Sequence, residues 1–352
     1  MNDNYERMKK LVNENIGEIP QNITLEWIKE KYNDNNSWFN LWFFTYSDLR
    51  GHTFDNNITS DMKRHINFST KTLMDNEFFK VTDSMFKPDE AIEQLHAKGI
   101  EGQNMEVAVI DYSFETLHNE IKEELISYTN LSDNRPHYHG TVVASLLCGK
   151  NIGVAPKAKL HFYGISQGVP SEEKQINDVI KSLEDIYEKN KNGANIRVVN
   201  LSSSMHRKNE KFFELSNKLK EQGCYVIDSI DFHKYHTPIN IDSNTNEYYY
   251  GIWQNKELDK IKSLIGIPTG SMIPLHETQD DYQYCGDASV SWSIPVLSGL
   301  FTLALQIKNN LTFDEFNEII INNKKTYEDG KTIIDVERTF SLIEEMNNNK
   351  TI

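Results

Sequence analysis

The chain alternates between short, continuous apolar runs and longer segments in which apolar residues recur with a helical period. The short runs are typical of buried parallel strands, and the longer segments of helices with one apolar stripe. We expect strands over residues 105–113, 158–165, 196–204 and 224–230. We expect helices over residues 87–100, 141–149, 173–190, 210–223, 291–307 and 311–321. This alternation predicts an α/β fold with a mostly parallel central sheet flanked by helices.

The composition of the chain changes near residue 83. Residues 1–82 are rich in Asn, Asp and aromatic residues, with one strand expected over residues 38–46, and we interpret them as an N-terminal extension. Residues 83–346 carry the alternation of strands and helices and form the main domain, and residues 347–352 form a tail. In the last predicted helix, Thr312 and Glu315 have the spacing of a capping box.

Composition and charge exclude several classes of partner. The 352 residues are 38% apolar and 25% charged, as in a soluble globular protein. The formal net charge of -15 opposes binding to nucleic acid or to an anionic membrane, because the electrostatic energy would be repulsive. The sequence has neither an N-terminal signal pattern nor a run of about 20 apolar residues, so we expect a cytoplasmic location. Cys148, Cys224 and Cys285 lack metal-binding spacing, and we expect no disulfide framework, no metal and no cofactor.

Three polar residues stand at the ends of predicted elements, where a parallel sheet gathers reactive groups. Asp111 ends the first predicted strand of the main domain, His139 directly precedes a small-residue helix, and Ser291 lies just before another helix. Each has an ordinary alternative: a helix cap for Asp111, a turn residue for His139 and an N-cap for Ser291. Together, an acid, an imidazole and a hydroxyl are the parts of a catalytic triad.

The motifs around these residues follow one another in a specific order. They are GIEGQNMEVAVIDYSFETLHNEI around Asp111, HGTVVASLL from His139, GVAPKAKL, VVNLSSS, SVSWSIPVLSG around Ser291, and LTFDEFNEII. In this order they resemble the subtilisin-like serine peptidases, the subtilases, over about residues 83–346. The resemblance implies a three-layer subtilisin-like fold, and SWSIP is similar to a divergent intracellular branch from low-GC Gram-positive bacteria.

The resemblance also implies a role for each triad residue. The family's nucleophile lies four residues before a proline, which selects Ser291 ahead of Pro295. His139 would be the base, and Asp111 would orient it. Ser289, Val290 and Trp292 stand where the family usually has Gly, Thr and Met.

Two departures from the family pattern concern the oxyanion hole and calcium. Family members carry an Asn at the end of the strand that corresponds to residues 224–230, where Asp231 falls nearest here, or Phe232 if the alignment moves by one residue. A carboxylate there could only accept hydrogen bonds, and the alternative for Asp231 is a loop carboxylate that faces water. The connection CGKN, residues 148–151, is shorter than the family's calcium loop and lacks its oxygen ligands, so we expect no metal there.

Ser202, Ser203 and Ser204 match the family's substrate-binding strand, to which an extended peptide adds through main-chain hydrogen bonds; an ordinary strand end is the alternative. Two functions are therefore predicted. One is a serine endopeptidase that cleaves peptide or protein substrates through an acyl-enzyme on Ser291. The other is a weak or inactive relative that binds a peptide or partner in a regulatory role. Residues 1–82 are either a prodomain counterpart or, as we favour, a retained extension packed on the catalytic domain.

Overall fold

The computed structural model covers most of the main domain and parts of the N-terminal extension. It describes residues 9–10, 13–14, 16–31, 44–55, 68–73, 90–114, 118–133, 137–167, 171–203, 206, 209–242, 247–249, 264–270, 272–275, 278–284 and 289–348.

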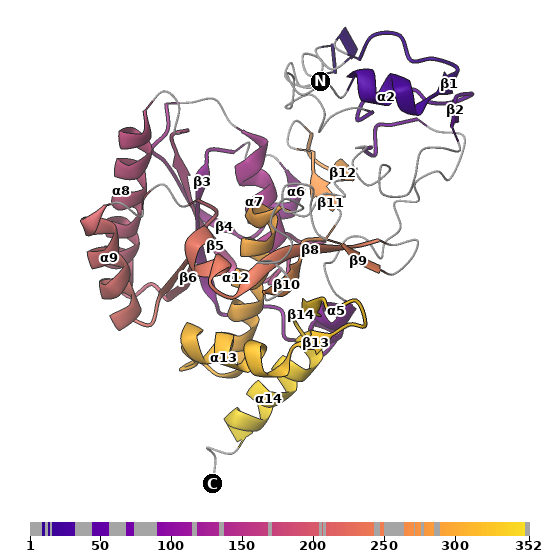
Figure 1. Ribbon diagram of the computed structural model, residues 1–352. Coiled ribbons are helices and arrows are strands. Elements are labelled where there is room, and N and C mark those ends of the chain that lie inside the picture. The colour runs from indigo at the N-terminus through magenta and orange to yellow at the C-terminus, as the bar shows by residue number, and fades with distance from the viewer. Residues whose placement is uncertain are drawn as a thin grey trace.

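A five-stranded parallel sheet forms the centre of the main domain (Figure 1). Its strands, in spatial order, are β4 (Leu125–Asn130), β5 (Lys159–Ile165), β3 (Glu106–Tyr112), β6 (Ile196–Leu201) and β7 (Tyr225–Asp228). The middle strand, β3, pairs with β5 on one side and β6 on the other. Asp111 therefore stands near the carboxyl end of the central strand, the edge at which α/β sheets place their sites.

Alternate residues of the sheet face two helical layers. The layers are formed by α7 (Tyr138–Cys148) with α12 (Val290–Ile307), and by α8 (Glu172–Lys191) with α9 (Glu210–Glu221). Val107 and Val109 pack in the core shared with α7 and α12, whereas Ala108 and Ile110 pack in the core shared with α8 and α9. Figure 1 shows these helix pairs on opposite sides of the sheet. The predicted α/β class, with helices flanking a parallel sheet, is confirmed.

A second sheet packs against α12 and mixes parallel with antiparallel pairs. Its order is β13 (Lys325–Thr326), β14 (Thr332–Ile333), β10 (Ile265–Pro268), β8 (His236–Asp242) and β9 (Glu247–Tyr249). Two helices, α13 (Phe313–Asn323) and α14 (Val336–Asn348), follow α12. The predicted capping box is present, because Thr312 and Glu315 bond each other's backbone at the start of α13. The remaining elements of the main domain are α5 (Glu90–Ala97), α6 (Asn119–Lys122), α10 (Ser229–His233), β11 (Met272–Pro274) and β12 (Tyr282–Tyr284).

The described parts of the extension contain β1 (Asn22–Ile23), α2 (Leu25–Lys31) and β2 (Thr53–Phe54). The extension is hydrogen-bonded to β12, through Thr70 N to the Tyr282 carbonyl at 2.9 Å and Tyr284 N to the Phe68 carbonyl at 2.6 Å. An ion pair of 2.9 Å joins Lys71 to Asp281 beside these bonds. The extension is therefore attached to the β11–β12 hairpin by backbone pairing and by charge.

An apolar contact extends this attachment toward α7. Ile16 and Tyr46 of the extension bury Leu275, which follows β11, and Tyr138 of α7 packs against the same cluster. Tyr138 directly precedes His139 in the chain, so the packed extension borders the turn that carries the candidate base.

Several predicted elements differ from the structure. The strand expected over residues 196–204 ends at Leu201, and the helix expected over residues 141–149 begins at Tyr138, so that His139 lies within it. Much of the strand expected over residues 38–46 lies outside the described residues, and its described part, residues 44–46, forms a turn. The strand expected over residues 224–230 ends at Asp228, where α10 begins, so Asp231 is a helical residue.

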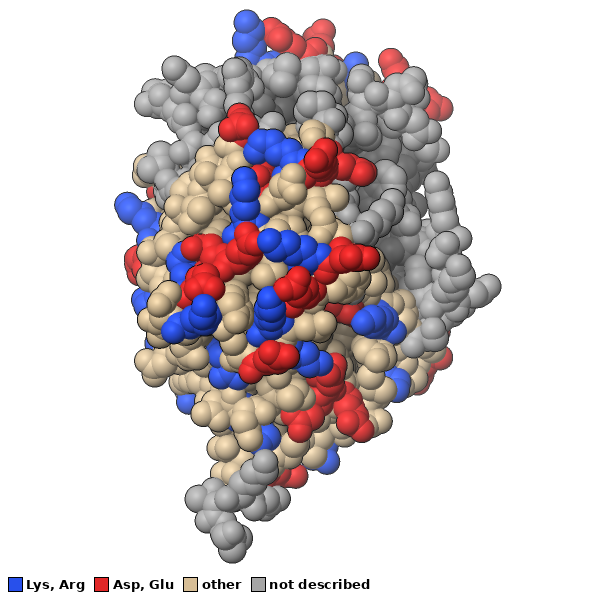
Figure 2. Space-filling model, turned by 90° about the vertical axis from the view of Figure 1, so that its left-hand side faces the viewer, with Lys and Arg blue, Asp and Glu red and all other residues tan. Residues whose placement is uncertain are grey.

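The surface over α8 and α9 carries both signs of charge. Figure 2 shows Lys and Arg interspersed with Asp and Glu on this face. Several of them form ion pairs, including Lys189 with Asp185 and Lys211 with Glu184. The net negative charge of the chain is therefore not gathered on this face.

One described helix, α12, is long and apolar enough by composition to span a bilayer, but 78% of it is buried inside the protein. Its apolar residues pack against α7 and both sheets. This burial accounts for its apolar composition as a core helix.

His236, at the start of β8, makes stability depend on pH. Its side chain is fully buried, Nε2 donates to Asn317 Oδ1 at 2.8 Å, and burial lowers the pKa of the imidazole to about 4. Unfolded His titrates near 6.5, so stability should fall as the pH drops from about 6.5 toward 4 and level off below, by about 3 kcal/mol in total. Urea unfolding at pH 7 and pH 5 should show a loss of about 2 kcal/mol from this residue. His236→Gln, which keeps an N–H donor for Asn317, should lose correspondingly less, and equal losses in the two proteins would contradict the assignment.

Candidate active site

Asp111 and His139 are in direct contact. His139 Nδ1 lies 2.7 Å from Asp111 Oδ1, and the same carboxylate oxygen accepts the Tyr112 N–H at 2.7 Å. Asp111 is only 5% exposed, so its carboxylate is solvated by these two hydrogen bonds and not by water. Because the carboxylate accepts from Nδ1–H, neutral His139 has its Nε2 unprotonated and able to act as a base.

Gly140 allows the first turn of α7, which includes His139, to lie against the end of β3. A Cβ at position 140 would lie 2.1 Å from the Tyr112 carbonyl oxygen, so only glycine lets α7 approach the end of β3 this closely. The HGT motif therefore holds His139 against Asp111 through a backbone contact that sequence position alone does not reveal.

Ser291 lies in the first turn of α12, on the helix that packs against α7. The next residue, Trp292, places its ring beside the His139 ring, with a centroid separation of 5.1 Å. Ser291 and His139 are both described, and no hydrogen bond joins their side chains in this structure. The structure thus gathers all three predicted triad residues at the meeting of β3, α7 and α12, with Asp111 and His139 already bonded.

A chain of polar groups connects the Ser291 turn to β6. Ser202 donates from Oγ to the Ser291 carbonyl at 3.3 Å, and Asn200 donates from Nδ2 to Ser202 Oγ at 3.3 Å. Farther along α12, the buried Ser298 donates to Asn200 Oδ1 at 3.1 Å. Ser203 is held by backbone bonds to Leu201 and from Ser229. The predicted substrate-binding residues Ser202 and Ser203 therefore adjoin the nucleophile turn, whereas Ser204 lies outside the described residues.

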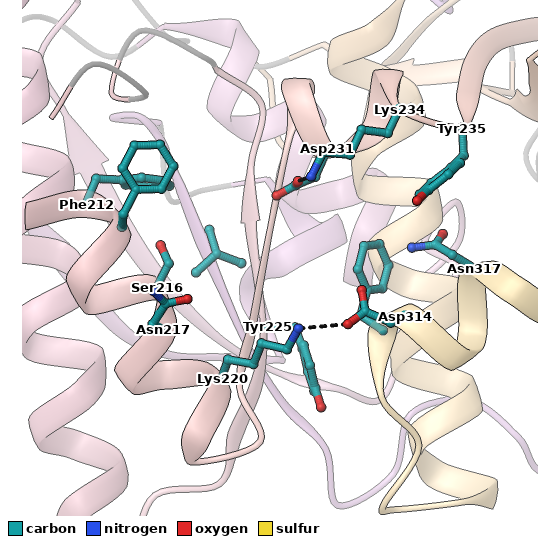
Figure 3. A pocket seen from close by; sticks show the side chains of 13 residues that line it. Phe212, Ser216, Asn217, Lys220, Tyr225, Asp231, Lys234, Tyr235, Asp314 and Asn317 are labelled. Carbon is teal, nitrogen blue, oxygen red and sulfur yellow. Dashed lines mark hydrogen bonds and ion pairs between the residues drawn. The ribbon is translucent and has the colours of Figure 1, made fainter. Parts of the chain in front are cut away.

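Asp231 does not stand at the end of β7. It lies in α10, where its carboxylate pairs with Lys234 at 2.5 Å, and both residues line a pocket that includes none of the three triad residues (Figure 3). The alternative, Phe232, is fully buried in the apolar core. The structure therefore offers no support for either residue as an oxyanion donor.

The residue that ends β7 is Asp228, which the sequence analysis did not select. Its Oδ1 accepts the N–H groups of Ile230 and Asp231, and its Oδ2 lies 2.9 Å from His206 Nε2. Asp228 and His206 are both buried, at 0% and 1% exposure. This carboxylate caps α10 and pairs with the His206 imidazole. It therefore stabilises the fold next to the predicted substrate-binding residues. A strand-end acid followed by residues that can begin a helix is a capping signal that could have indicated it.

The side chain of Glu120, in α6, binds the connection CGKN, residues 148–151, where we expected no metal. This buried carboxylate accepts the N–H groups of Asn151 and Ile152 at 3.0 and 3.2 Å and the Asn151 amide at 2.7 Å, and it is also bonded to the Tyr282 hydroxyl. Desolvation by burial and the nearby Glu120 charge raise the pKa of Tyr282, so its hydroxyl stays a donor. Among the described residues, no group of three or more His, Cys, Asp or Glu is placed to hold a metal ion. Glu120 thus provides the hydrogen-bond acceptors for the backbone N–H groups of this loop.

Removing the Glu120 side chain should lower the free energy of unfolding. Glu120→Ala leaves the Ile152 and Asn151 N–H groups and the Tyr282 hydroxyl without their acceptor, and we expect a loss of about 3 kcal/mol in the free energy of unfolding. Glu123→Ala is the control, because Glu123 is exposed and, among the described residues, forms an ion pair with exposed Lys150 alone, at 3.0 Å; its removal should cost less than about 1 kcal/mol. Both values follow from urea unfolding at pH 7. Equal effects of the two substitutions, or a large fall in Tm on adding EDTA to wild type, would contradict this role.

The two cysteines in the described part of the chain show no sign of reactivity. Cys148 and Cys224 are free and buried, and burial raises the pKa of the Cys224 thiol to about 12 and that of Cys148 further still. Both thiols therefore remain protonated and packed. Cys285 lies outside the described residues.

The match to a family model covers two of the three candidate residues. The model of the Subtilase family matches residues 102–237, a stretch that holds Asp111 and His139. The major intracellular serine protease of Bacillus subtilis (strain 168) is 32% identical over 81 residues, which cover 19% of this chain and 25% of that protein. The matching region thus spans a quarter of the relative's length.

Solved structures similar to this chain include two proteases. The prenylagaramide maturation protease PagA is 14% identical with a TM-score of 0.48, covering 72% of this chain and 99% of that one. A cold-adapted subtilisin-like serine proteinase is 15% identical with a TM-score of 0.46, covering 66% of this chain and 89% of that one. The subtilase resemblance predicted from the sequence motifs is confirmed by the family match over residues 102–237.

Proposed function

We propose that this protein is a serine endopeptidase that cleaves peptide or protein substrates through an acyl-enzyme on Ser291. The observation that carries the proposal is the 2.7 Å bond between Asp111 and His139, at the point where α12 presents Ser291 and Trp292. The family match and the Bacillus serine protease relative support the broader class of serine peptidase.

The proposed reaction assigns one role to each residue. His139 Nε2 takes the proton from Ser291 Oγ as that oxygen bonds to the substrate carbonyl carbon, while Asp111 holds the imidazole in the required tautomer. Collapse of the tetrahedral intermediate breaks the C–N bond, and His139 returns the proton to the leaving amine. Water, deprotonated by His139, then cleaves the Ser291 ester and releases the acid.

The oxyanion must be bound by donors other than a side chain at position 231. Amide groups in the first turn of a helix have no intrahelical acceptor, and the Ser289 side chain makes no capping bond to them. We assign the Ser291 N–H, in this first turn, as the oxyanion donor. The Ser202 bond to the Ser291 carbonyl helps to hold that peptide in place.

One observation favours the weak or inactive alternative. The strand-end carboxylate of Asp228 is fully engaged as an acceptor, so β7 contributes no side-chain donor of the kind that stabilises an oxyanion. A weak relative would still bind peptides beside Ser202 and Ser203. We further propose a cytoplasmic location, because the Bacillus relative is an intracellular protease.

A fluorophosphonate probe separates the two functions. An activated serine should become labelled stoichiometrically, with peptide mapping placing the adduct on Ser291, because only a nucleophile beside a base reacts at a useful rate. Heat-denatured protein is the control for nonspecific reaction. Absence of labelling in folded protein, or an adduct on another serine, would reject the endopeptidase proposal.

A further inference from the structure

Pro295 lies inside α12, four residues after Ser291. In an α-helix, the carbonyl of each residue accepts the N–H of the residue four positions later. Proline has no N–H, so Pro295 leaves the Ser291 carbonyl without the donor that an α-helix supplies. The proline therefore opens one hydrogen-bonding position in the turn that carries the candidate nucleophile.

Ser202 supplies a donor at this open position. Its hydroxyl donates to the Ser291 carbonyl at 3.3 Å. Because Ser202 directly follows β6, the bond connects the central sheet to the first turn of α12. A partly buried carbonyl without a donor lowers stability, and the Ser202 hydroxyl satisfies it.

Asn200 determines where the Ser202 hydroxyl points. Asn200 is fully buried in β6, and its Nδ2 donates to Ser202 Oγ at 3.3 Å. The amide nitrogen cannot accept, so the Ser202 proton is directed away from it and toward the Ser291 carbonyl. The other end of the amide, Oδ1, accepts from the fully buried Ser298 hydroxyl of α12 at 3.1 Å. The three bonds thus run in one direction, from the middle of α12 through β6 to the first turn of α12.

The peptide that receives the Ser202 bond is held at both of its polar atoms. This peptide joins Ser291 to Trp292, whose N–H donates to the Ser289 carbonyl at 3.0 Å. With its N–H and its carbonyl both bonded, the peptide cannot turn freely. It therefore fixes the backbone that carries the Ser291 side chain and the Trp292 ring, which lies 5.1 Å from the His139 ring between centroids.

From these observations we propose that Asn200 and Ser202 are positioning residues for the nucleophile. They replace the hydrogen bond that Pro295 removes from the Ser291 carbonyl, and so hold the turn from which Ser291 attacks. The role belongs to the Ser202 hydroxyl and is separate from main-chain pairing with a substrate. Its effect on rate rests on the proposed function, whereas the bond itself can be tested by stability alone.

A double-mutant cycle in urea unfolding at pH 7 tests the replacement without any use of activity. Ser202→Ala should raise the unfolding equilibrium constant about tenfold in wild type, because the Ser291 carbonyl loses its donor. In Pro295→Ala, residue 295 regains an N–H for that carbonyl, and adding Ser202→Ala should raise the constant by less than about threefold. Equal effects of Ser202→Ala in the two backgrounds would refute the proposal.

Ser182→Ala is the matched control for this cycle. Ser182 is also a fully buried serine, and its hydroxyl donates to the Asp178 carbonyl of α8 at 2.8 Å. Its removal should change the unfolding constant equally in wild type and in Pro295→Ala, because Ser182 makes no bond to α12. A Ser182 effect that depends on Pro295 would show that the cycle does not isolate the Ser202 bond, and would overturn the proposal.

Peptide turnover measures the positioning effect. Ser202→Ala should lower kcat at least about tenfold with KM unchanged, because the main chain at this position can still pair with substrate. Ser202→Thr keeps the hydroxyl and should return kcat to within a few-fold of wild type, and Ser182→Ala should leave kcat unchanged. An unchanged kcat in Ser202→Ala would confine the bond to the fold and overturn the positioning role.

Asn200→Asp tests the direction of the bonds. It keeps the size of the side chain but replaces the amide donor with a carboxylate that only accepts, so the Ser202 hydroxyl would turn toward it and leave the Ser291 carbonyl. We expect kcat to fall as far as in Ser202→Ala, with no further fall when the two substitutions are combined. Losses that multiply, with folding checked by circular dichroism, would refute the role of Asn200; Asn200→Ala takes its place if the carboxylate prevents folding. If wild type shows no turnover, the proposed peptidase function fails, and the cycle with Pro295→Ala still decides whether Ser202 replaces the missing N–H.

Discussion

Ser291→Ala should lower kcat by about 10⁶, the size of the loss on removing the nucleophile of subtilisin itself, because the residues of a triad act as a unit. The fold should be unaffected, since no side-chain hydrogen bond to His139 is lost from the structure. Peptide turnover by purified protein, measured with a chromogenic substrate, gives the value.

Ser289→Ala provides the matched control for this change. Ser289 precedes the same helix, and its side chain makes no capping hydrogen bond, so its removal should leave turnover within a few-fold of wild type. Turnover by Ser291→Ala equal to that of Ser289→Ala would show that Ser291 is not the nucleophile.

Asp111→Asn should lower kcat by about 10⁴, the loss measured when a triad aspartate becomes an amide. The amide can donate toward His139 Nδ1 and so favours the tautomer with the proton on Nε2, where the base must be free. Because His139 Nδ1 and the Tyr112 N–H share one carboxylate oxygen, an amide NH2 at that position also leaves the Tyr112 N–H without its acceptor, and we expect a loss of about 1–3 kcal/mol in the free energy of unfolding beside the loss in rate.

Asp178→Asn is the control for this second prediction. Asp178 is also a buried carboxylate, bonded to the Ser166 N–H and to Lys174, but it does not contact His139. Its replacement should reduce stability while leaving kcat per folded molecule unchanged. A similar fall in kcat for both variants would mean that Asp111 acts only through the fold.

The central sheet was predictable because its strands are continuous apolar runs. Residues such as Val107 and Ala108 face opposite helical layers, and this double burial explains why β3 is continuously apolar from Val107 to Ile110. The contact between Asp111 and His139 followed from a motif order, and the structure adds the crowded Gly140 backbone that enforces it.

Other elements left weaker signals. β4 is a half-exposed edge strand with several polar residues, and two strands of the second sheet contain a proline, Pro238 in β8 and Pro268 in β10. The end of β7 could not be placed because the apolar residues continue past Asp228 to Ile230. A helix begins there because the Asp228 carboxylate accepts hydrogen bonds from the N–H groups of the next turn. Asp231 therefore lies in α10 and not at the strand end where the family pattern would place it.

The attachment of the extension to β12 also bears on how this protein can be dissected. A recombinant fragment lacking residues 1–82 would uncover Leu275, which is fully buried in the intact chain, and would remove the hydrogen bonds that Thr70 and Phe68 make to the backbone of β12. An exposed strand edge beside an apolar patch recruits other chains, so such a fragment would self-associate when expressed. Crystallisation and assay of this protein should therefore begin from the full polypeptide.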